Sequence, residues 1–147
     1  MKKNKLAGQV FEIEKAKLVK EAFEARKTAY VPYSKFAVGA ALMCGNGKIF
    51  RGCNIENAAY TPTNCAERTC VFKAVSEGEK DFVAIAVCGG YEQDTQYCFP
   101  CGVCRQVLME FCNPEDFVVL VAKNPDEYKE YSFKDLLPHG FGPENLK

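Results

Sequence analysis

The chain has no run of apolar residues approaching the ~20 needed to cross a bilayer. It also has no excess of either charge, because 19 Lys and Arg residues balance 19 Asp and Glu residues. Proteins that bind nucleic-acid phosphates usually carry a strong basic excess, so a small molecule is the expected ligand. The N-terminal lysines precede no continuous apolar segment, so a secretory signal is not expected.

Histidine is nearly absent. The only one, His139, follows Pro138 and has no second histidine beside it, so we interpret it as a solvated or packing residue. Cysteine is abundant, with nine residues, and this odd number without an export signal argues against a disulfide framework. The sequence therefore predicts a reducing, cytoplasmic location in which some cysteines are metal ligands.

The length of 147 residues predicts one domain, residues 1–147, whose core needs no disulfides. Apolar residues at three- and four-residue spacing predict a helix over residues 12–29. Two more helices are expected over 65–76, capped by Thr63 or Asn64, and over 101–111, with Pro100 at its first position. Ser132 is expected to cap a short helix that runs through Leu137.

Apolar segments predict strands over residues 36–44, 49–53, 82–88 and 117–122, with a short last strand at Tyr131-Ser132. Gly45-Asn46-Gly47 predicts a tight hairpin between the first two strands. Residues 89–99 and 124–130 are polar and are expected to form loops or turns. The predicted fold class is α/β, a three-layer αβα arrangement with helices on both faces of a mixed five-stranded sheet.

Three cysteines and one glutamate carry the chemistry. Cys65-Ala66-Glu67 and Pro100-Cys101-Gly102-Val103-Cys104 both fall at expected helix starts, where amide groups and the helix dipole favour thiolates. Three thiolates can fill three positions of a zinc tetrahedron and leave the fourth for water, as in catalytic zinc sites. This arrangement matches the three-cysteine form of the zinc deaminase signature. The sequence therefore predicts Cys65, Cys101 and Cys104 as Zn²⁺ ligands.

Two neighbouring side chains complete the predicted site. Glu67 lies two residues after the first thiol and is expected to transfer protons without binding the metal. Arg68 is expected to donate hydrogen bonds to the sulfurs and offset the negative charge of three thiolates. Arg105 is a weaker candidate for that role and is interpreted as structural.

The other six cysteines mostly lie in apolar segments and are interpreted as small buried hydrophobes: Cys44, Cys53, Cys70, Cys88, Cys98 and Cys112. Cys98 differs from the others because it lies in a loop near the predicted metal.

Three other functions remain open at this point. A thiol-disulfide oxidoreductase would use the Cys101/Cys104 pair, but it leaves Cys65-Ala66-Glu67 unexplained. A zinc-stabilised binding module would need a fourth protein ligand. A deaminase acting on polynucleotides is disfavoured by the neutral charge.

Several separated motifs resemble the cytidine deaminases, in the small homotetrameric branch whose first zinc ligand is cysteine. They are Phe36-Ala37-Val38-Gly39-Ala40-Ala41-Leu42, Cys53-Asn54-Ile55-Glu56-Asn57-Ala58-Ala59-Tyr60, Cys65-Ala66-Glu67-Arg68-Thr69, Pro100-Cys101-Gly102-Val103-Cys104-Arg105-Gln106-Val107 and Phe141-Gly142-Pro143-Glu144-Asn145-Leu146. The likeness covers residues 13–146. Phe99, where the family often has a small polar residue, and the loop over 90–98 depart from the pattern.

The resemblance implies hydrolysis of cytidine and deoxycytidine to uridine and deoxyuridine with release of ammonia, a step of pyrimidine salvage. It implies that Asn54 and Glu56 bind the ribose 3′-hydroxyl and that Phe36 packs against the base. It also implies that Glu67 and the Ala66 backbone recognise the pyrimidine edge. Residues matching Ala58, Tyr60 and Phe141 reach a neighbouring subunit's site in this family, which implies a homotetramer with shared active sites.

Overall fold

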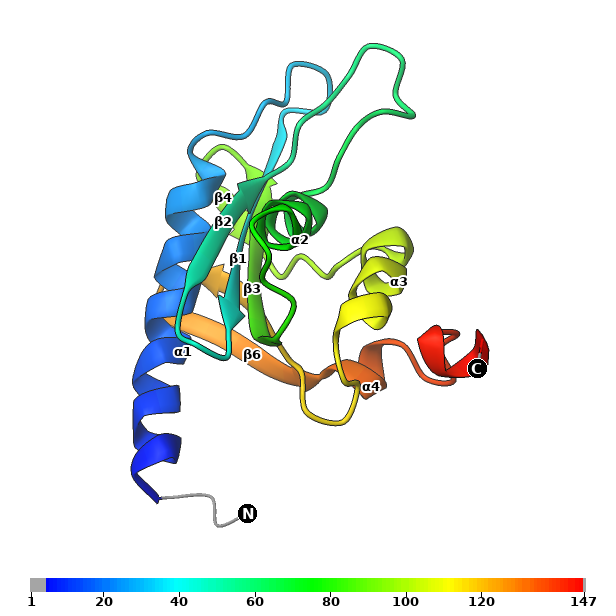
Figure 1. The fold of residues 1–147 in the computed structure, drawn as a ribbon. Helices are drawn as coiled ribbons and strands as arrows, with labels where there is room; N and C mark the ends of the chain where they lie inside the picture. Colours follow the sequence, from blue (N-terminus) through cyan, green and yellow to red (C-terminus); the bar gives the residue numbers. More distant parts are fainter. Residues whose placement is uncertain (1–4, 147) are drawn as a thin grey trace.

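The computed structural model describes residues 5–146, and their side chains from Glu14 onward. A single sheet forms the middle layer (Figure 1). The elements, in chain order, are α1 (Lys5–Arg26), β1 (Phe36–Cys44), β2 (Ile49–Cys53), α2 (Ala66–Ser76), β3 (Phe82–Tyr91), β4 (Asp94–Gln96), α3 (Gly102–Phe111), β5 (Val118–Asn124), β6 (Glu127–Ser132), α4 (Phe133–Leu136) and the 3₁₀ turn η1 (Pro143–Leu146). None of the described helices is both long and apolar enough to span a membrane.

The strand order is β2-β1-β3-β5-β6, and the short β4 pairs with β3 beside this path. Only β3 and β5 are parallel; the other pairs are antiparallel, so the sheet is mixed. Helix α1 covers one face, while α2 and α3 lie on the other (Figure 1). The predicted fold class is confirmed, with one short strand more than expected.

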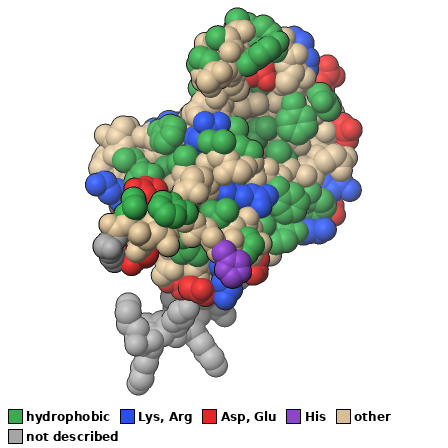
Figure 2. Space-filling view, turned by 90° about the vertical axis from the view of Figure 1, so that its right-hand side faces the viewer, with side chains coloured by type: hydrophobic (Ala, Val, Ile, Leu, Met, Phe, Trp, Pro, Cys, Tyr) green, Lys and Arg blue, Asp and Glu red, His purple; other side chains and the backbone are tan. Residues whose placement is uncertain are grey.

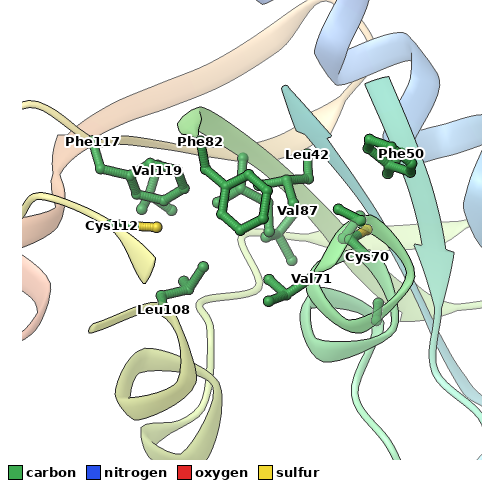
Figure 3. Close-up of a cluster of buried hydrophobic side chains, with 14 of the residues drawn as sticks. Leu42, Phe50, Cys70, Val71, Phe82, Val87, Leu108, Cys112, Phe117 and Val119 are labelled. Atoms are coloured by element: carbon green, nitrogen blue, oxygen red, sulfur yellow. The ribbon is translucent and has the colours of Figure 1, made fainter. Parts of the chain in front are cut away.

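Each face of the sheet has its own hydrophobic core, because successive strand residues point to opposite faces. Along β1, Ala41 and Met43 pack with Leu18 and Val19 of α1. The larger core lies beneath α2 and α3, where side chains from the sheet and both helices point toward one another (Figure 3). Its central residues include Leu42, Val71, Val87, Leu108, Cys112 and Phe117. This core fixes the two helices that carry the predicted metal ligands.

The contact between α1 and β1 requires glycine at position 39. A Cβ atom there would overlap the carbonyl oxygen of Ala22 and would lie 2.7 Å from the Cβ of Arg26. At the end of α1, the Arg26 Nε donates to the Ala37 carbonyl (2.9 Å) and Nη2 donates to the Gly90 carbonyl (2.7 Å). Arg26 therefore ties the start of β1 to the end of β3.

Several predicted boundaries are wrong. Helix α1 begins before residue 12 and ends at Arg26 rather than at residue 29. Strand β3 continues to Tyr91 and turns into β4, within a segment predicted to be a loop. Strand β6 begins at Glu127, within a segment predicted to be a turn. Strand β4 and the first part of β6 consist mostly of exposed polar residues, so their sequences show little apolar alternation.

Two predicted helix starts are displaced by a residue. Cys65 occupies the N-cap of α2, rather than Thr63 or Asn64. Cys101 occupies the N-cap of α3, so Pro100 precedes the helix instead of opening it. Ser132 stands at the N-cap of α4 as predicted, but its hydroxyl makes no capping bond there and donates to the Pro114 carbonyl instead.

Candidate metal and catalytic site

The fold brings together the three cysteines that the sequence singled out. The Sγ atoms of Cys65 and Cys101 are 3.8 Å apart, and those of Cys101 and Cys104 are 3.6 Å apart. All three sulfurs lie within 4.8 Å of one another. Sulfurs bound to one tetrahedral zinc at about 2.3 Å would be separated by about 3.8 Å, so these thiols fit a zinc ion.

Helix geometry places these thiols. Cys65 and Cys101 are the N-cap residues of α2 and α3, and Cys104 lies in the first turn of α3. The backbone amide of Cys104 donates to the Cys101 sulfur at 3.5 Å. Two helix N-termini therefore point their partial positive charge at the sulfurs, which favours thiolates and metal binding.

Arg105 holds the loop before α3. Its Nε donates to the Pro100 carbonyl (2.7 Å) and its Nη1 donates to the Leu136 carbonyl (2.6 Å). Both contacts are to backbone, as expected for a structural residue.

Glu67 lies in the first turn of α2, and only 4% of its surface is exposed. Burial raises the pKa of its carboxyl from 4.5 to about 7, because desolvation disfavours the charged form. The Cys104 thiol acts in the opposite direction and lowers the pKa of this carboxyl. A carboxyl group that titrates near neutral pH beside a metal-binding cluster is suited to general acid–base catalysis.

Arg68 extends toward the cluster from the same turn. Its Nη2 donates to the Cys65 sulfur at 3.1 Å, while its buried Nε has no hydrogen-bond partner among the described residues. Hydrogen bonds from Cys104 and then from Arg68 lower the pKa of the Cys65 thiol. Of the two hydrogen-bonded thiols, Cys65 and Cys104, Cys65 therefore loses its proton more readily.

Asn54 and Glu56 lie on the segment that follows β2, beside the start of β1. The Asn54 side chain bridges the backbone of β1: its Nδ2 donates to the Phe36 carbonyl (2.8 Å), and its Oδ1 accepts from the Val38 amide (2.9 Å). The Glu56 carboxylate accepts hydrogen bonds from the residues just before Phe36. The three predicted substrate-binding residues thus form one connected group.

Other predicted residues differ widely in exposure. Ala66 is fully buried, whereas Ala58, Tyr60 and Phe141 are exposed. Tyr60 packs edge-on against Tyr33, with ring centroids 6.2 Å apart. The Phe141 carbonyl accepts a hydrogen bond from the Gln106 side chain of α3 (2.8 Å). Both exposed aromatic residues are therefore held in place by contacts with residues outside the cysteine cluster.

The remaining cysteines follow the prediction in part. Cys44, Cys70, Cys88 and Cys112 are buried, whereas Cys53 and Cys98 are partly exposed. Burial raises the pKa of Cys98 to about 11, so its thiol stays protonated at neutral pH. None of the nine cysteines forms a disulfide. His139 is exposed, as interpreted from the sequence (Figure 2).

Sequence reasoning missed the supporting role of two polar residues at this site. The Thr69 hydroxyl lies within hydrogen-bond distance of two backbone carbonyls that can share its one hydrogen, those of Cys53 (3.0 Å) and Cys65 (3.2 Å), and its oxygen accepts from the Asn64 side chain. Ser34 contacts Glu56. Thr69 lies at the end of the Cys65-Ala66-Glu67-Arg68-Thr69 motif but was given no role there, and Ser34 lies in no motif with a known chemical role.

A family model described as "Cytidine and deoxycytidylate deaminase zinc-binding region" matches residues 13–121. The chain belongs to the cytidine deaminase family. It is 48% identical to a cytidine deaminase of Halalkalibacterium halodurans, over 91% of this chain and 98% of that protein. It is 52% identical to a cytidine deaminase of Sporosarcina psychrophila, over 88% of this chain and 93% of that protein.

The structure agrees with this assignment. A crystal structure of the cytidine deaminase from Burkholderia pseudomallei superposes with a TM-score of 0.77 and 44% identity, covering 85% of this chain and 97% of that chain. The predicted enzyme, a cytidine deaminase, is confirmed. The oxidoreductase alternative is not supported, because the Cys101 and Cys104 sulfurs belong to a three-thiol cluster in a deaminase fold.

Proposed function

We propose that this single-domain enzyme is a hydrolase that converts cytidine and deoxycytidine to uridine and deoxyuridine, with release of ammonia, at a zinc site. The observation that supports it best is the convergence of three thiols beside one buried carboxyl group at two helix starts. The proposed biological role is pyrimidine salvage. The absence of disulfides is compatible with the reducing cytoplasm, where we propose that the enzyme works.

Cys65, Cys101 and Cys104 would bind the zinc ion. Zinc in such a site supplies Lewis acidity and lowers the pKa of water. Three thiolates carry more negative charge than zinc carries positive charge, which opposes that effect. Arg68 offsets the excess, because its guanidinium group lies against the Cys65 sulfur.

Glu67 would carry the protons. It would take one proton from the attacking water and deliver it to N3 of the cytosine ring, and then take the second proton from the hydroxyl group formed at C4 and deliver it to the departing amine. Its pKa of about 7 in the metal-free site lets it both accept and donate at neutral pH. The buried backbone of Ala66 and the Glu67 side chain would recognise the pyrimidine edge.

Asn54 and Glu56 would bind the ribose 3′-hydroxyl, and Phe36 would pack on the base. An amide and a carboxylate suit a hydroxyl group, while an aromatic face suits a flat ring. Phe36 is itself held edge-on against Tyr91, with centroids 5.2 Å apart. Because Asn54 and Glu56 would bind the ribose 3′-hydroxyl, the site favours a free nucleoside over a polynucleotide.

The enzyme is proposed to form a homotetramer in which Ala58, Tyr60 and Phe141 reach a neighbouring subunit's site. Exposed apolar side chains support this arrangement: Tyr60 is 73% and Phe141 56% exposed. Hydrophobic side chains also reach the surface on the side that carries α3 and the C-terminal segment (Figure 2). Large exposed apolar surfaces commonly mark protein interfaces.

The direct test follows the ultraviolet absorbance change when cytidine or deoxycytidine is incubated with zinc-loaded protein. We expect conversion of both nucleosides and none of cytosine within a single-stranded oligonucleotide. Conversion of the oligonucleotide alone, or of neither nucleoside, would contradict the proposal.

A further inference from the structure

The carboxylate of Glu56 is held by three donors from one short turn. Its Oε1 accepts from the backbone amides of Tyr33 (3.0 Å) and Ser34 (3.1 Å). Its Oε2 accepts from the Ser34 hydroxyl. A carboxylate has about four lone-pair positions, so these bonds leave about one for a further donor.

The Ser34 hydroxyl has a defined direction. The Phe36 backbone amide donates to the Ser34 oxygen at 3.0 Å. Because that N–H occupies one lone pair of the oxygen, the hydroxyl hydrogen is left to point at Glu56. Ser34 thus connects two residues that lie on different segments and have different proposed roles.

The backbone around this contact is fixed as well. The Tyr30 amide donates to the Asn54 carbonyl (3.0 Å), and the Glu56 amide donates to the Tyr30 carbonyl (2.9 Å). Lys35, at φ 62°, turns the chain sharply between Ser34 and Phe36. The left-handed backbone at Lys35 lets the Ser34 side chain and the Phe36 amide face each other.

The charge of Glu56 depends on the same contacts. The Ser34 hydroxyl is the largest cause that lowers the pKa of this carboxyl, and the backbone amides of Ser34 and Tyr33 add to it. Glu56 would be ionised at neutral pH even without these contacts, and they favour the ionised form further. The hydrogen bonds that orient the carboxylate all come from one turn.

We propose that Ser34 is a positioning residue for substrate recognition: its hydroxyl fixes the Glu56 carboxylate so that the remaining acceptor position faces the ribose 3′-hydroxyl. The inference rests on the proposed role of Glu56. Ser34 itself touches no substrate atom in this account. It acts on binding, so its loss should raise KM while kcat stays unchanged.

The test compares cytidine with 3′-deoxycytidine in the zinc-loaded enzyme. Ser34→Ala should raise KM for cytidine roughly tenfold, as expected for losing a hydrogen bond to a charged group. It should leave KM for 3′-deoxycytidine unchanged, because that substrate lacks the hydroxyl that Glu56 would bind. Ser34→Thr keeps the hydroxyl and should restore most of the affinity for cytidine.

Two further variants serve as controls. Ser76→Ala removes an exposed hydroxyl that donates to the Lys73 carbonyl at the far end of α2, and it should behave as wild type. Adding Ser34→Ala to Glu56→Ala should cause no further loss, because the two changes remove one interaction. Thermal unfolding of each variant verifies that the fold is intact.

The outcomes separate the two claims. If Glu56→Ala raises KM equally for cytidine and 3′-deoxycytidine, or for neither, the proposed role of Glu56 fails. If Glu56→Ala raises KM for cytidine alone but Ser34→Ala matches wild type, only the inference about Ser34 is overturned. The inference about Ser34 would also be overturned if Ser34→Ala raised KM equally for both substrates. Such a loss of affinity would come from a change in the turn and in Phe36 rather than in Glu56.

Discussion

The burial of Glu67 predicts how the stability of the metal-free enzyme depends on pH. The carboxyl group has a pKa of about 7 in the folded protein, against 4.5 when it is solvated. Because the folded state holds this proton more tightly, Glu67 stabilises the fold fully below about pH 4.5. That contribution is lost as pH rises through about 7.

The size of the effect follows from the two pKa values. A difference of one pH unit corresponds to about 1.4 kcal/mol, so the free energy of unfolding should fall by about 3 kcal/mol from this residue alone. The glutamine side chain of Glu67→Gln cannot ionise, so this variant should not lose that free energy of unfolding as the pH rises. Relative to the metal-free wild type, the variant should therefore gain about 3 kcal/mol between about pH 4.5 and about pH 8.

Urea unfolding of chelator-treated proteins at several pH values measures this difference. Glu77→Gln is the matched control, because Glu77 is exposed at the other end of α2 and should track wild type. All nine cysteines are present in all three proteins, so their main effect on stability cancels. If the curves of Glu67→Gln and wild type stay parallel across this range, the carboxyl is not desolvated and the reasoning is wrong.

Four other changes have defined outcomes. Glu67→Gln should retain its zinc yet lower kcat roughly 10²–10⁴-fold, because general acid–base catalysis is lost; wild-type turnover would refute the proton-transfer role. Cys101→Ala should lose zinc by elemental analysis, and full occupancy would remove Cys101 from the ligands. Arg68→Gln should lower kcat without emptying the site, and unchanged kinetics would leave Arg68 without a catalytic effect. Gly39→Ala should cost about 3 kcal/mol of stability, because its Cβ would overlap the Ala22 carbonyl, whereas Gly102→Ala has open space and should be neutral.

The parts of the fold that were predicted correctly have strong local signals. Strands β1 and β2 match the predicted ranges because the buried, β-branched and apolar residues end at Gly45-Asn46-Gly47. The cysteines of the cluster were predicted because few chemistries need thiols at that spacing. The family resemblance supplied the enzyme class, which the comparisons confirmed.

The parts that were missed depend on tertiary contacts. Strand β4 is polar and forms only by pairing with the end of β3, where Gly90 lets the two backbones approach closely. The Ser34 contact with Glu56 joins residues 22 positions apart through a turn at Lys35. Neither feature follows from hydrophobic periodicity. The roles of Asn54, Phe36, Tyr60 and Phe141 remain predictions, and the comparison of cytidine with 3′-deoxycytidine tests the role of Glu56.

The most direct measurement is X-ray absorption at the zinc edge of the purified protein, together with its metal content. The account predicts one zinc per chain, with three sulfur ligands at about 2.3 Å and one lighter ligand. A chain without zinc, or a zinc ion closed by a fourth sulfur such as that of Cys98, would contradict it.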